Sequence, residues 1–126
     1  MADIIQSGES GLSVRNKLNS LYGDVPVPLD WSGTLVPNVY LPITYDTTLT
    51  GNATLSATGI RAGASFLLIL RQGGTGGNIL SYDSVYKFDG SGEAPVLTTT
   101  SGAIDFFYGW AFSDTEIYGF TLNDIR

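Results

Sequence analysis

The sequence LLILRQGGTGGNIL at residues 67–80 places four glycines and a threonine between two aliphatic runs. A glycine-rich loop after an apolar strand is where nucleotide-binding proteins hold phosphate groups. A P-loop also needs Lys and then Ser or Thr after its last glycine, and a dinucleotide site needs a helix that begins there. Here Gly77 is followed by the strand-like run Asn78-Ile79-Leu80. The loop is therefore interpreted as a hairpin turn whose glycines need positive φ, so that valine at Gly76 or Gly77 costs folding.

The composition excludes several other kinds of chemistry. The 126 residues include no Cys and no His, which removes disulfides, Cys/His zinc sites, a Cys nucleophile and His-based triads. Six Lys and Arg against twelve Asp and Glu give a formal net charge of −6 and leave no basic stripe, which argues against a nucleic-acid partner. No apolar run is long enough to span a membrane, and the N-terminus does not read as a signal peptide.

Carboxylates are the remaining candidates for catalysis. Glycoside hydrolysis needs two of them facing each other across a sugar, but most here lie beside Gly, Ser or Thr in expected turns. The run DGSGE at residues 89–93 resembles part of a calcium loop but lacks the EF-hand spacing. Asp105 differs, because it lies in the apolar stretch AIDFF, and we expect it to accept hydrogen bonds from a nearby turn. The sequence predicts no enzyme, no catalytic residue, no metal and no cofactor.

Aromatic side chains offer a second kind of site, because exposed rings can stack on sugars. The candidates are Trp31, Tyr40, Tyr45, Tyr82, Tyr86, Tyr108, Trp110 and Tyr118. Trp110 lies on an expected strand between other aromatic residues, which favours a core or interface position. A glycan-binding module stays the alternative to a structural protein.

Seven strand-like runs follow each other at short spacing. They cover residues 39–46, 48–58, 65–72, 78–90, 95–100, 103–113 and 115–124. Pro42 favours an edge position for the first run, and the last two meet in a short hairpin connection at Ser113-Asp114. With turn signals between the runs and no helix among them, the pattern predicts an all-β fold, an antiparallel, jelly-roll-like β-sandwich over residues 39–126.

Two runs are apolar on both faces. In residues 65–72, Phe66, Leu68 and Leu70 point one way and Leu67 and Ile69 point the other, so this strand is either central in a sandwich or covered by a partner chain. In residues 103–113, five large side chains share one face and Phe107 lies on the other. This is more apolar surface than one thin sandwich easily buries, so we expect copies of the chain to associate.

Residues 1–38 are expected to form a separate N-terminal part. Val14, Leu18, Leu21 and Tyr22 fall on one stripe of a helix of two to three turns. So short a helix is marginal alone and must dock, either on its own domain or on another subunit. Residues 24–38 contain three prolines and are interpreted as an extended arm, with Trp31 as an anchor.

An ordered set of short motifs covers residues 49–118. It comprises Thr58-Gly59, the element QGGTGG at 72–77, Lys87-Phe88, the turn and strand from Gly92 through Pro95 to Leu97-Thr98, and Ile104-Asp105-Phe106-Phe107. Together these resemble a β-module of bacteriophage virion proteins, particularly tail fibres and other head or tail appendages. The usual tryptophan after the lysine is Phe88 here. GESGLSVRNKLNSLYGDV at 8–25 resembles a short helix common in phage fibre and structural proteins, through Gly8, Ser10, Gly11, Val14, Arg15, Lys17, Leu18 and Asn19.

The resemblance implies a non-catalytic virion component that is oligomeric, often trimeric. We expect a capsid decoration, head-fibre or tail-appendage subunit on the surface of the phage particle, made in the host cytoplasm. Its partners would be further copies of itself and major capsid or tail proteins, with a host-surface glycan as the alternative. The expected attachment and interface residues are Val14, Leu18, Leu21, Tyr22, Trp31, Leu67, Ile69 and Phe107.

Overall fold

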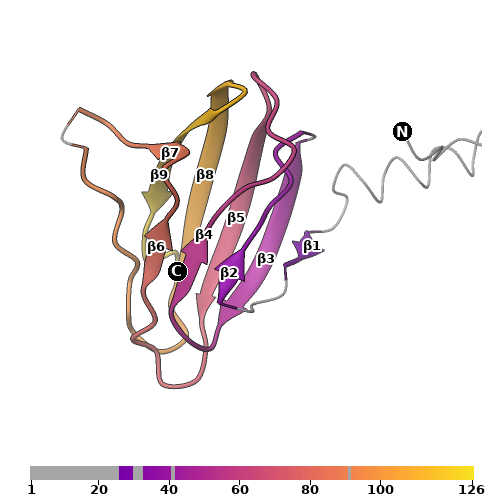
Figure 1. Cartoon of the computed structure of the whole chain (residues 1–126). Helices are drawn as coiled ribbons and strands as arrows, with labels where there is room; N and C mark the ends of the chain where they lie inside the picture. Colours follow the sequence, from indigo (N-terminus) through magenta and orange to yellow (C-terminus); the bar gives the residue numbers. More distant parts are fainter. Residues whose placement is uncertain (1–25, 30–32, 41, 91) are drawn as a thin grey trace, which may run out of the picture.

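Figure 1 shows the fold of the chain as a computed structural model, in which residues 26–29, 33–40, 42–90 and 92–126 are described. All regular structure in these residues is β-strand, which confirms the all-β prediction; the expected N-terminal helix lies outside them. The strands are β1 (Val27–Pro28), β2 (Thr34–Leu35), β3 (Ile43–Leu49), β4 (Ala53–Leu55), β5 (Ser65–Gln72), β6 (Leu80–Tyr82), β7 (Tyr86–Lys87), β8 (Ile104–Ser113) and β9 (Glu116–Leu122).

The strands form two mixed or parallel sheets, which corrects the expectation of an antiparallel fold. The larger sheet has the order β1-β3-β5-β8-β9-β7, and the smaller has the order β2-β4-β6. Strands β1, β3 and β5 are mutually parallel, as are β2, β4 and β6, because the chain passes to the other sheet at each connection from β1 to β7. Parallel neighbours need a long crossover, and the intervening strand of the other sheet provides it.

The C-terminal strands close the larger sheet with antiparallel pairs. Strand β8 pairs with β5 on one side and with β9 on the other, and the predicted β8–β9 hairpin turns, after a bulge, at Asp114 and Thr115, one residue later than expected. Strand β5 occupies the predicted range 65–72, whereas 95–100 contains no strand. Pro42 precedes β3, which lies between β1 and β5, so the predicted edge position is wrong.

Described parts of the expected N-terminal arm belong to the sheets. Val27 pairs with Tyr45 on β3, and Thr34 and Leu35 pair with β4. Leu35 is completely buried. The chain therefore enters the sheets before residue 39, where the second part was expected to begin.

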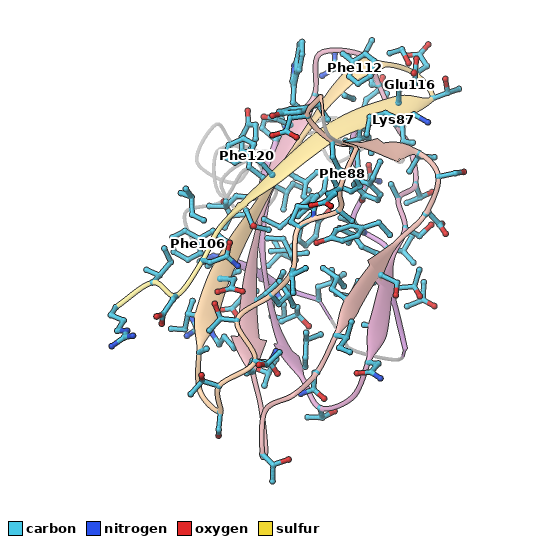
Figure 2. All side chains as sticks on the ribbon, turned by 90° about the vertical axis from the view of Figure 1, so that its left-hand side faces the viewer. Lys87, Phe88, Phe106, Phe112, Glu116 and Phe120 are labelled. Carbon is cyan, nitrogen blue, oxygen red and sulfur yellow. The ribbon has the colours of Figure 1, made fainter. Side chains whose placement is uncertain are left out.

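One core lies between the two sheets (Figures 1 and 2). Along β5 the side chains alternate strictly, with Phe66, Leu68 and Leu70 buried. The smaller sheet contributes buried side chains from each of its strands, such as Leu55. Ring contacts connect the layers, since the centroid of Phe107 lies 6.0 Å from that of Phe66 and 5.6 Å from that of Tyr82 on β6.

A pair of glycines makes room for the largest core side chains. Gly109 on β8 is directly opposite Gly119 on β9, and both are buried. A Cβ at Gly109 would overlap the ring of Phe66, and a Cβ at Gly119 would overlap the ring of Phe107. The two glycines thus let aromatic rings approach the backbone of the larger sheet, which a side chain at either position would prevent.

Candidate interaction surface

The outward side of the larger sheet carries a continuous apolar surface, here called the aromatic face. It consists of side chains on β5, β8 and β9 that point away from the smaller sheet: Leu67, Ile69, Ile104, Phe106, Tyr108, Trp110, Phe112, Tyr118, Phe120 and Leu122. In Figure 2, Phe106 and Phe120 lie on this outward side, while Phe88 lies between the two sheets.

Strand register arranges these side chains in rows across three strands. Tyr108 lies between Leu67 on β5 and Phe120 on β9, and the row next to it places Phe106 between Ile69 and Leu122. The ring centroids of Tyr108 and Phe120 are 5.3 Å apart, and those of Trp110 and Phe112 are 6.2 Å apart. The first contact joins β8 to β9 and the second lies along β8, and aromatic contacts of this kind stabilise the sheet.

Much of this surface is open to solvent. Trp110, Phe112, Phe120 and Leu122 are 44%, 42%, 39% and 55% exposed. The three aromatic side chains alone leave on the order of 250 Å² in contact with water, given their full size. Exposed large apolar groups gathered in one patch indicate a binding surface, whereas the same groups scattered singly do not.

The side of the aromatic face toward β3 is polar but internally neutralised. Arg71 on β5 holds the carboxylate of Asp46 on β3 in a two-point ion pair, with nitrogen–oxygen distances of 2.9 and 3.0 Å. The hydrogen bond to Asp46 and its charge raise the pKa of Arg71 above the ordinary value. The apolar surface therefore ends at Arg71 and Asp46, whose opposite charges cancel each other.

A hollow of about 220 Å³ lies beside the aromatic face, at the start of β3 and β5. Its lining includes the hydroxyl-bearing Thr44 and Ser65, together with Pro42 and Leu67. Ser65 pairs with Trp110 across β5 and β8. The outward side of the sheet thus combines a ridge of rings with an adjacent depression.

The residues expected at an interface divide into three groups. Leu67 and Ile69 lie on the aromatic face, on the outward side of β5. Phe107 does not, because it is 0% exposed and packs inside the chain, which corrects its assignment as an interface residue. The remaining ones, Val14, Leu18, Leu21, Tyr22 and Trp31, lie outside the described residues.

Sequence reasoning did not assign Phe120 and Leu122 to this surface, although β9 contributes both. The run TEIYGFTL alternates Tyr118, Phe120 and Leu122 against Ile117 and Gly119. Together with the predicted hairpin, this alternation places the two outward sets of β8 and β9 on the same face. Among the expected sugar-stacking rings, Tyr45 and Tyr86 are buried.

The glycine loop after β5 crosses to the other sheet instead of forming a hairpin. Strand β6, which follows it, pairs with β4 in the smaller sheet. The loop is held by buried Gln72, whose amide nitrogen donates to the carbonyls of Asn78 and Thr98, at 2.8 and 3.1 Å. The predicted positive φ is confirmed at Gly76 and Gly77, both at 76°.

Asp105 organises two segments at one end of the larger sheet. One of its carboxylate oxygens accepts the backbone N–H of Thr98 at 2.6 Å and the side-chain amide of Asn123 at 3.0 Å. The other accepts the backbone N–H of Asp124 at 2.7 Å. The expectation that this buried carboxylate receives hydrogen bonds from nearby turns is confirmed.

Two tyrosines, Tyr82 partly buried and Tyr86 buried, line the core beside Phe107. The Tyr82 hydroxyl donates to the carbonyl of Pro95 at 3.0 Å, and the Tyr86 hydroxyl donates to the carbonyl of Ser56. Burial raises the pKa of both phenols well above the ordinary value, and nearby Asp105 adds to this effect for Tyr82. Both hydroxyls are neutral donors to backbone carbonyls throughout the ordinary pH range.

The described residues contain no group of three or more His, Cys, Asp or Glu side chains placed to hold a metal ion. Within the same residues, no helix has the length and apolar character needed to cross a membrane. No protein-family model, no curated protein and no solved structure matches the chain.

Proposed function

We propose that the chain is a non-catalytic structural protein of a bacteriophage particle, whose β-domain associates with further copies through the aromatic face. The observation that carries this proposal is the group of outward rings on β8 and β9, three of which, Trp110, Phe112 and Phe120, are more than one-third exposed. The resemblance of residues 49–118 to a β-module of phage virion proteins is the reason for proposing a capsid decoration, head-fibre or tail-appendage subunit.

The chemistry of the aromatic face suits association between proteins. Aromatic residues are enriched at the centres of such interfaces, where charged residues are depleted. The ten side chains of the aromatic face carry no charge; Arg71 and Asp46 form a closed ion pair at its border toward β3, and Lys87 lies beside Tyr118 at its border toward β7. Copies of a chain with net charge −6 can therefore bring this surface together without placing carboxylates opposite one another.

The proposed architecture has two functional parts. The facing sheets act as a β-sandwich domain, and three copies bury their aromatic faces against one another around a common axis. The N-terminal segment, with the apolar stripe of Val14, Leu18, Leu21 and Tyr22 and the anchor Trp31, attaches the trimer to a major capsid or tail protein. This arrangement removes the apolar surface from water and leaves the smaller sheets on the outside.

A receptor- or glycan-binding module is the second candidate. The hollow beside the aromatic face is favoured for this role, because Ser65, which lines it together with Thr44, is the cross-strand partner of the exposed Trp110. A ring for stacking and hydroxyls for hydrogen bonding are the groups that a sugar site requires. Association through the aromatic face would cover Trp110, so both uses cannot operate at one time.

Purified particles of the phage that encodes the chain test the proposal. We expect the protein to be present in them by mass spectrometry and to be located on the head or tail by immunolabelling. A variant without residues 1–23 should fold and be absent from the particles. If the truncated protein occupies particles fully, the attachment role is wrong, and if the full chain is missing from them, the virion assignment is wrong.

Trp31→Ala separates the two candidate functions. A structural role predicts loss of the protein from particles while the isolated chain keeps its circular dichroism spectrum. A receptor role predicts normal particles that no longer adsorb to host cells. Arrays of host-surface glycans, with Trp110→Ala as a second variant, provide the direct measurement for the receptor role.

A further inference from the structure

Strand β6 ends the smaller sheet, and its outer edge has no partner strand among the described residues. On its inner side, the N–H of Ala53 donates to the carbonyl of Ile79 at 3.0 Å, and the N–H of Asp83 donates to the carbonyl of Leu55 at 2.9 Å. Successive residues of a strand direct their backbone groups to opposite edges. The intervening residues Leu80 and Tyr82 therefore direct their N–H and C=O groups to the free edge.

A groove of about 130 Å³ lies at the beginning of this edge, between Leu80 and the chain's own segment 94–99. Ile79 and Leu80 form one side, and Pro95 and Val96 form part of the other. No charged residue lines it. An apolar cavity of about 150 Å³ holds one benzene molecule, so this groove has room for one aliphatic side chain. Val96 and Ile79 are 79% and 57% exposed at its rim.

We propose that this groove binds an extended, uncharged segment of another polypeptide. The segment adds to β6 by hydrogen bonds to Leu80 and Tyr82, and it places one aliphatic side chain between Ile79 and Val96. The free N–H and C=O groups present alternating partial positive and negative charges, which an extended backbone complements at the spacing of a sheet. The uncharged lining gives no attraction to an ionised ligand.

The groove is separate from the aromatic face. It borders the smaller sheet, whereas the aromatic face is the outward side of the larger one, and the two surfaces have no residue in common. A subunit could therefore join copies of itself through one surface and bind a second protein through the other. Loss of either interaction would leave the other in place.

NMR titration of the ¹⁵N-labelled full chain with the peptide acetyl-Thr-Val-Thr-Val-Thr-amide tests the proposal. We expect saturable shifts at the amides of Leu80 and Tyr82, with slower hydrogen exchange there. The amide of Ser81, which faces β4, should shift less. The same peptide N-methylated at every peptide bond keeps its side chains but cannot pair with a strand, and it should cause no such shifts.

Variants at two exposed valines provide matched controls. Val96→Asp places a charge at the groove and should weaken peptide binding at least fivefold, whereas Val36→Asp, outside the groove, should leave binding unchanged. The proposal is overturned if the N-methylated peptide binds equally well, if the shifts occur elsewhere, or if no shift occurs. It is also overturned if the Leu80 and Tyr82 amides shift with protein concentration alone, because a second copy would then occupy the groove.

Discussion

Gly119 on β9 leaves the space that the ring of Phe107 on β8 occupies. A Cβ built on Gly119 would overlap one carbon of that ring and come within 3.0 Å of another. Phe107 is completely buried and also contacts Phe66 and Tyr82, so its ring has no free space to enter. A position without a side chain thus determines how the two sheets pack.

Gly119→Ala should lower the free energy of unfolding by about 1–3 kcal/mol through overpacking, measured by urea denaturation. Phe107→Leu creates space at the same place and should itself destabilise. The double variant should be more stable than the sum of the two single effects predicts, with a coupling energy above about 0.5 kcal/mol. Additive effects would show that Gly119 and Phe107 do not compete for space.

Asp105→Asn should destabilise the chain by about 2–4 kcal/mol. The asparagine side chain has no charge, and its NH2 group replaces one of the two oxygens that accept hydrogen bonds from Thr98, Asn123 and Asp124. An N–H donor that faces this NH2 group then has no acceptor. Asp83→Asn makes the same chemical change at an exposed carboxylate and should stay within about 0.5 kcal/mol of the parent chain. Equal thermal unfolding midpoints for both variants would contradict the structural role of Asp105.

Gly76→Ala should cost about 1–3 kcal/mol more than Gly74→Ala. Both positions have positive φ, so both substitutions carry backbone strain. Only at Gly76 would the new Cβ also overlap the carbonyl oxygen of Thr99 and lie 2.7 Å from the nitrogen of Ser101, whereas Gly74 faces open space. Equal losses of stability in urea denaturation would show that strain alone determines the cost in this loop.

Stability should fall above about pH 10 because of Tyr82 and Tyr86. The unfolded chain releases phenol protons near pH 10, whereas the folded chain retains them, because burial raises both pKa values. Each tyrosine thus stabilises the fold fully below pH 10 and loses about 1.4 kcal/mol of that contribution per pH unit above it. Denaturant unfolding between pH 8 and pH 12 measures the slope.

Tyr82→Phe serves as the control for this pH dependence. It removes one titrating group and should make the decline above pH 10 shallower, although the variant loses the hydrogen bond to Pro95 and is less stable at neutral pH. An unchanged slope would mean that Tyr82 ionises equally in the folded and unfolded chain.

Local periodicity predicted most of the strands but not their partners. The alternation in residues 65–72 shows which side chains share a face, and that prediction is confirmed at every position of β5. The parallel pairing of β3 with β5 depends on the chain passing through the other sheet between them, and no local pattern encodes that path. The two-residue strands β1 and β2 are too short for any period to be visible.

Two further differences have specific causes. Residues 95–100 resemble a strand in sequence. In the structure, however, the backbone N–H of Thr98 donates to the carboxylate of Asp105 and not to a neighbouring strand. For residues 103–113, alternation separates Phe106 from Phe107 without showing which one faces inward. That choice is made by the smaller sheet, whose side chains cover the Phe107 side and leave the Phe106 side open.

The proposed aromatic interface is tested most directly by the mass of the chain in solution. Sedimentation velocity at micromolar concentration should give three times 13.4 kDa for the parent chain. The double variant Trp110→Thr and Phe120→Thr should sediment as a folded monomer, and Val96→Thr, at an exposed position outside the aromatic face, should stay trimeric. A monomeric parent chain, or a double variant that keeps the trimer mass, would contradict the proposed interface.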